Sequence, residues 1–143
     1  MESAWFIHVV GTAFIAGLAI SGTRSLEEVR GELGGVIRSH DDLEKVRQAI
    51  NQNMLLAAVM AVSLLVWLAA WGLLMHFAYM SRSDILVGGI LGAALIPLNI
   101  FYCGPVTRRF KAMPVTSPDP EIQETFTRWK REWLTLRLQL SDG

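Results

Sequence analysis

His8 and His76 are the side chains whose type and position best predict chemistry inside a membrane. Each imidazole lies in an apolar stretch, and a histidine nitrogen is a common axial ligand of haem iron. A small residue stands four positions before each histidine, Ala4 before His8 and Gly72 before His76, which leaves space beside each ring on its helix face. The pair suggests ligation of haem b or of a chlorophyll, and hydrogen bonding near the membrane interface is the alternative reading.

This hypothesis depends on two antiparallel membrane spans. The 27 residues from Met54 to Met80 include no Asp, Glu, Lys or Arg, and a helix of that length is about 40 Å long, against a hydrocarbon core of about 30 Å. His8 follows the start of the first span by four residues, and His76 precedes the end of the second by four. We therefore expect both imidazoles at the same depth, near one face of the membrane.

The sequence predicts a single all-α integral membrane domain with three spans, at residues 4–23, 54–80 and 85–106. Hydrophobic residues make up 52% of the 143 residues and charged residues 18%, which agrees with this class. Residues 24–53 form a polar connection with a break at Gly31, Gly34 and Gly35. Ser39 is predicted to cap the helix that leads into the second span, and the neighbouring His40 is expected to be solvated.

The basic residues predict the orientation of these spans. Of the 13 lysines and arginines, all except Arg82 lie in the 24–53 connection or after Val106. Because basic residues accumulate on the cytoplasmic side, the N-terminus is expected outside and the C-terminus inside, in a bacterial inner membrane. The first span has no basic stretch before it, so we interpret it as an uncleaved span and not as a signal peptide.

Polar side chains are few within the spans. Asn99, Tyr102 and Cys103 follow Pro97, which is expected to kink the third span, and an amide at that depth requires a hydrogen-bond partner. No span contains a carboxylate, which argues against a pump or a secondary transporter. Cys103 is the only cysteine, so an internal disulfide is excluded, and motifs for zinc, phosphate or Ser-His-Asp chemistry are absent.

Two faces of small residues predict close helix packing. Ala13, Gly17 and Ser21 recur every four residues in the first span, and Gly88 and Gly92 form a GxxxG pattern in the third.

A final amphipathic helix is predicted at residues 119–140, with Asp119 as its cap. Its basic and aromatic side chains are expected to lie on lipid or to pack on a partner subunit or the 24–53 connection, and nucleic acid is not expected. The residues that would make these contacts are Arg128, Trp129, Arg131 and Trp133.

The last third of the chain resembles the anthrone-oxygenase-like family of small membrane proteins. The similarity rests on Pro97-Leu98-Asn99 and on the Trp/Arg-rich segment Arg128 to Trp133 with Leu136 and Arg137. It implies a small membrane oxygenase with Asn99, Trp129 and Arg137 as its candidate residues. In that family a fourth span follows this segment, and the present sequence ends at Gly143 without one.

Three functions follow from these patterns. The favoured one is a non-catalytic accessory subunit without a cofactor, which packs against other membrane subunits through its small-residue faces. The second is a haem- or chlorophyll-binding membrane protein that uses His8 and His76. The third is the membrane oxygenase that the resemblance implies.

Overall fold

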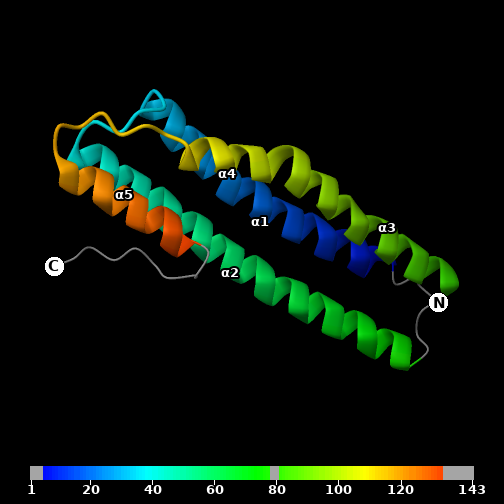
Figure 1. The fold of residues 1–143 in the computed structure, drawn as a ribbon. Coiled ribbons are helices and arrows are strands. Elements are labelled where there is room, and N and C mark those ends of the chain that lie inside the picture. Colours follow the sequence, from blue (N-terminus) through cyan, green and yellow to red (C-terminus); the bar gives the residue numbers. More distant parts are fainter. Residues whose placement is uncertain (1–4, 78–80, 134–143) are drawn as a thin grey trace.

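The computed structural model describes residues 5–77 and 81–133. In these residues the chain is helical, with no strand. The helices are α1 (Trp5–Glu32), α2 (His40–His76), α3 (Arg82–Leu98), the π-helix η1 (Asn99–Cys103), α4 (Gly104–Lys111) and α5 (Pro120–Glu132). Figure 1 shows α1, α2 and the continuous α3–η1–α4 segment running side by side, with α5 against the first half of α2.

Three helical segments in the described part of the chain are long and apolar enough to cross a membrane: Phe6–Glu32, His40–His76 and Arg82–Lys111. The prediction of three candidate spans in an all-helical chain is therefore confirmed by length and composition. The helices continue past the predicted ends of the first and third spans, because α1 runs to Glu32 and α4 to Lys111. Residues 4 and 78–80 of the predicted spans lie outside the described residues.

The connection between α1 and α2 has the predicted cap, and its break lies at Gly34 and Gly35, whereas Gly31, predicted as part of the break, lies within α1. Gly34 and Gly35 adopt positive φ angles of 62° and 75°, which glycine adopts without steric cost. The Ser39 hydroxyl accepts a hydrogen bond from the backbone N–H of Asp42 at 3.2 Å and so caps α2. With 37 residues, α2 is about 55 Å long and extends well beyond a bilayer core.

The third helical segment changes its hydrogen-bond pattern after Pro97. A capping box between Ser81 and Asp84 starts α3, and Pro97 lies within it near its end. The five residues of η1 follow as a π-helix, and the Gly104 N–H bonds to the Asn99 carbonyl five residues back. Proline provides no N–H for the carbonyl four residues before it, so Pro105, the second residue of α4, leaves the Phe101 carbonyl within η1 without its regular partner. π-helical turns of this kind frequently mark functional sites.

A cluster of buried hydrophobic side chains, here called the connection core, lies at the end of the bundle where α5 packs (Figure 1). It contains side chains of α1, α2, α4, α5 and the segments between them. A parallel bridge joins the two connecting segments, with the Ile37 N–H bonded to the Pro114 carbonyl and the Thr116 N–H to the Ile37 carbonyl. The buried members are Leu26, Leu33, Ile37, Leu43, Val46, Ala49, Ile50, Met54, Val106, Phe110, Met113, Ile122, Phe126, Trp129 and Trp133.

The apolar face of α5 is buried in this core. Ile122, Phe126 and Trp129 are its buried residues, and the Trp133 indole N–H donates to the Asn53 side-chain oxygen at 3.2 Å. Helix α5 therefore packs on the chain's own 24–53 connection. This was one of the alternative placements that the sequence pattern allowed for the helix. Residues 134–140 of the predicted helix lie outside the described residues.

Candidate functional site

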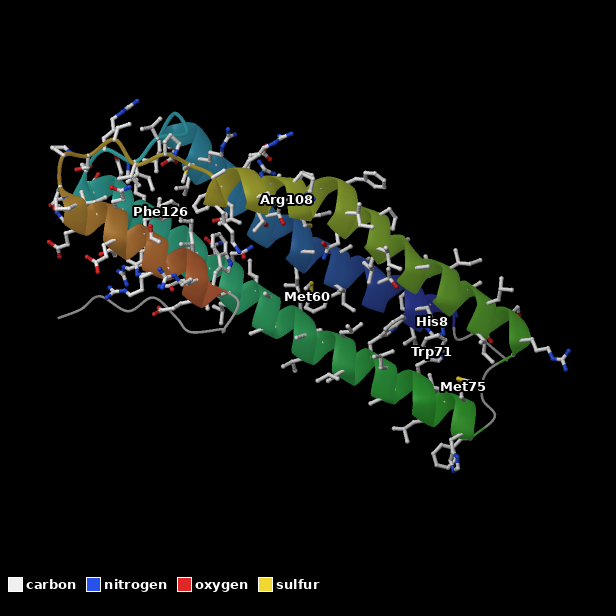
Figure 2. All side chains as sticks on the ribbon, in the orientation of Figure 1. His8, Met60, Trp71, Met75, Arg108 and Phe126 are labelled. Atoms are coloured by element: carbon white, nitrogen blue, oxygen red, sulfur yellow. The ribbon has the colours of Figure 1, made fainter. Side chains whose placement is uncertain are left out.

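His8 lies in an aromatic cluster between the three long helices (Figure 2). The side chain is 0% exposed, and its ring meets Trp67 and Trp71 of α2 edge to face, with centroid separations of 5.9 and 5.5 Å. The two indoles contact each other at 5.5 Å. We call His8, Thr12, Trp67 and Trp71 the His8 cluster.

Glycines allow the helices to approach at this level. A Cβ atom added to Gly88 of α3 would lie 3.1 Å from the His8 ring, and one added to Gly92 would lie 3.4 Å from the Trp67 ring. On α1, a Cβ added to Gly11 would lie 2.5 Å from Trp67. Gly88 and Gly92 thus lie where the GxxxG pattern places a close contact: a Cβ at Gly88 would crowd the His8 ring, and one at Gly92 would be in ordinary contact with Trp67.

Replacing Gly11 by alanine is expected to lower the free energy of unfolding by about 1–3 kcal/mol, because the new methyl group would overlap the Trp67 indole. Gly17 is the matched control, since a Cβ there meets no atom within 4 Å. Gly17→Ala should leave stability unchanged or raise it, because alanine is the better helix former. Thermal unfolding in detergent measures both variants. Equal melting temperatures for the two would show that the Gly11 contact is not formed.

Five buried polar atoms of the His8 cluster have no hydrogen-bond partner among the described residues. They are both ring nitrogens of His8, the Thr12 hydroxyl and the indole nitrogens of Trp67 and Trp71. A buried polar group without a partner costs about 1–3 kcal/mol, so five together would cost about as much as a whole domain gains on folding. The His8 cluster is therefore a candidate binding site for a small polar ligand.

The structure does not bring His76 to His8. His76 is exposed at the end of α2 and meets the neighbouring Phe77 ring at 5.2 Å. Trp71, which contacts His8, lies five residues before His76, a separation of about 7.5 Å along the helix. Because Trp67, Trp71 and Gly88 enclose the His8 ring, no observation favours a haem or chlorophyll ligated by the pair.

Ala13, Gly17 and Ser21 are exposed on α1, so the chain's own helices do not cover this small-residue face. A close contact there would require another molecule. The predicted close packing of these three residues therefore remains a prediction about contact with a partner molecule.

A cavity of about 360 Å³ lies between α1, α2 and the third helical segment, between the His8 cluster and the connection core. Figure 2 shows Met60, one of its lining residues, on the face of α2 toward α1. Ala61, Leu64 and Asn99 are lining residues with exposed side chains, so the cavity opens to the surface that faces lipid. The lining residues are Ile15, Leu18, Ala19, Gly22, Thr23, Asn53, Leu56, Ala57, Met60, Ala61, Leu64, Leu95, Leu98, Asn99, Cys103 and Thr107.

The cavity has an apolar end and a polar end. Ile15, Leu64 and Leu95 line the end nearer the His8 cluster, whereas the polar side chains lie toward the connection core. The polar side chains are Thr23, Asn53, Asn99, Cys103 and Thr107, and no lining residue is charged.

The two asparagines have hydrogen-bonding capacity left for a ligand. The hydroxyls of Thr23 and Thr107 donate to carbonyls of their own helices at 2.8 and 2.9 Å. Asn53 uses its oxygen to accept from Trp133, and its amide nitrogen makes no hydrogen bond with the described residues. The Asn99 side chain, in the π-helix, makes none with them either. The partner that the sequence predicts for Asn99 is therefore absent from the described residues.

Two of the oxygenase candidates, Asn99 and Trp129, lie in different parts of the fold. Asn99 lines the cavity, Trp129 is buried in the connection core, and Arg137 lies outside the described residues. Trp133 is also buried in that core, whereas Arg128 and Arg131 are exposed on α5. The two tryptophans thus serve packing within the chain. Sequence reasoning did not identify Trp67 and Trp71, although their spacing of four residues on one helix face was a usable signal.

An exposed group of His40, Asp119 and Glu121 lies where α2 and α5 begin, with possible ligand atoms within 4.8 Å of one another. Both helices direct the positive ends of their dipoles here, which disfavours a cation. The Asp119 carboxylate accepts the Glu121 backbone N–H at 2.9 Å and contacts the His40 ring at 3.0 Å. These two contacts, the backbone one foremost, hold the pKa of Asp119 below its ordinary value.

This carboxylate predicts a pH dependence of α5 docking. Because the native pKa of Asp119 is lowered, its contribution to stability is present above its ordinary pKa of about 3.9 and is lost as pH falls through the native value. Asp119→Ala should increase proteolysis at α5 modestly at pH 7, and the difference from wild type should become smaller at a pH well below about 3.9. A difference that is the same at both pH values would contradict this role.

Comparisons with known protein families, with curated proteins and with solved structures find no match to this chain.

Proposed function

We propose that the protein is a non-catalytic integral membrane protein that binds one neutral, single-chain amphiphile in the cavity between its three long helices. The observation that supports this most is the polarity of the cavity, with an aliphatic end and a polar end at which two side-chain amides have hydrogen-bonding capacity left. An alkyl chain would lie along Ile15, Met60 and Leu95, with its head group against Asn53 and Asn99.

The size and charge of the cavity support this class of ligand. A volume of about 360 Å³ lies at the lower end of the range for small-molecule sites, about 300–1,000 Å³. The absence of a charged side chain from its lining disfavours a charged head group, because a buried charge without a partner is costly. Access from the hydrocarbon layer past Ala61 and Leu64 suits a ligand that partitions into lipid.

In the orientation that we propose, the connection core and α5 are cytoplasmic, in a bacterial inner membrane. The basic residues of the 24–53 connection and of the chain after Val106 support this side. The ligand head group would then lie at the cytoplasmic end of the cavity.

Cys103 provides the test, because it lines the cavity and is the only cysteine. The rate at which N-ethylmaleimide labels the protein in nanodiscs should fall by about tenfold or more at saturating monooleoylglycerol, with oleate protecting less. Labelling at an unchanged rate would overturn the binding site. Equal protection by oleate would overturn the neutral head group.

A second candidate function is the accessory subunit, supported by the exposed Ala13, Gly17 and Ser21 on α1. In a Cys103→Ser background, Gly17→Cys should give one cross-linked product of defined size in native membranes, as expected for a helix that approaches this face closely. Leu65→Cys, at an exposed position of α2, is the control and should give none. Identical products from both positions would argue against a specific partner.

A further inference from the structure

The His8 cluster contains more hydrogen-bonding groups than its own residues satisfy. Trp67 and Trp71 are each donors only, whereas neutral His8 supplies one donor and one acceptor, and the Thr12 hydroxyl supplies both. None of their five polar atoms has a partner among the described residues, although the rings lie within 5.9 Å of one another, centroid to centroid.

We propose that this cluster is a buried hydration site, in which ordered water accepts hydrogen bonds from the Trp67 and Trp71 indoles and donates to His8 and Thr12. Water suits this combination of donors and acceptors because it offers two acceptor and two donor positions. Buried waters typically make about three hydrogen bonds to polar groups that lack other partners. The inference does not depend on a ligand in the larger cavity.

Water fits these groups better than an ion. A metal ion would require several ligand atoms, whereas indole N–H groups only donate and the cluster offers one imidazole acceptor. An anion would suit the indole donors, but the four residues of the cluster include no lysine or arginine, and a buried charge without a partner is costly.

The site is expected to connect the three long helices at the end opposite the connection core. His8 and Thr12 come from α1, Trp67 and Trp71 from α2, and Gly88 on α3 closes over the imidazole. Helices in lipid lack a hydrophobic drive to associate, so such bridging hydrogen bonds contribute to their packing.

Water-to-protein cross-relaxation measured by NMR on the full chain in nanodiscs tests the proposal. The indole N–H resonances, assigned with Trp67→Phe and Trp71→Phe, should show cross-peaks to a long-lived water for at least one of these two tryptophans. Trp133 is the internal control, since its indole N–H already donates to Asn53. Absence of water cross-peaks at both Trp67 and Trp71 would overturn the site.

Thr12→Val provides a matched substitution, because it removes the hydroxyl and keeps the shape of the side chain. It should weaken the water cross-peaks while leaving the contact between His8 and Trp71 in place. A folded Thr12→Val protein with unchanged cross-peaks would exclude Thr12 from the site. Thr12→Val thus decides the role of Thr12, and the wild-type spectrum decides the presence of water.

Discussion

Replacing Phe126 by alanine is expected to lower the stability of the connection core by about 3–5 kcal/mol and to release α5. Phe126 is 1% exposed and lies at the centre of the buried face of α5, between Ile122 and Trp129. Its removal leaves a cavity that the surrounding helices cannot fill without moving. Hydrogen–deuterium exchange of α5 peptides, measured in nanodiscs, should rise by two or more orders of magnitude.

Gln123→Ala is the control for this change, because Gln123 is exposed on the same helix. Its α5 peptides should retain wild-type exchange. If Phe126→Ala also left exchange unchanged, α5 would not pack on the 24–53 connection as described. Faster exchange in both variants would instead point to a helix that is already open.

Replacing Ala57 by phenylalanine is expected to reduce amphiphile binding by tenfold or more, equivalent to at least about 1.4 kcal/mol. Ala57 lines the cavity at the middle of α2, and an aromatic ring there would occupy much of the 360 Å³. Protection of Cys103 by monooleoylglycerol, measured as its half-maximal concentration, reports the loss. Tertiary structure should persist, because the cavity is open on one side.

The control for this substitution is Ala69→Phe, on an exposed position of the same helix outside the cavity lining. It adds the same ring and should leave protection of Cys103 unchanged. Equal loss in both variants would mean that bulk on α2 disturbs the protein in general. No loss in Ala57→Phe would remove the cavity as the binding site.

Local chemistry made much of the fold predictable from the sequence. The long apolar runs predict the three candidate spans, and the glycine break and the Ser39 cap correctly predict where α2 begins. These features depend on residues close together in the sequence, where capping and backbone conformational preferences act.

The candidate sites depend on contacts between distant residues, which the sequence pattern did not determine. Counting residues from the span ends predicts the same membrane depth for His8 and His76. The packing of Gly11 against Trp67 instead places His8 beside Trp67 and Trp71. Because α1 begins and α2 ends at different depths, counting from these ends misplaces His76 relative to His8 by more than one helical turn. The sequence indicates that Asn99 is an amide that requires a partner, but the cavity beside it is lined by residues of three helices that are far apart in the sequence.

Photoaffinity mapping in nanodiscs tests the central claim, that the cavity holds a neutral amphiphile, most directly. A monoacylglycerol with a diazirine in its alkyl chain should attach to lining residues such as Ile15, Met60 and Leu95, and unlabelled monooleoylglycerol should compete for these sites. Adducts spread over outward-facing residues such as Leu65 and Phe101, without competition, would contradict the account.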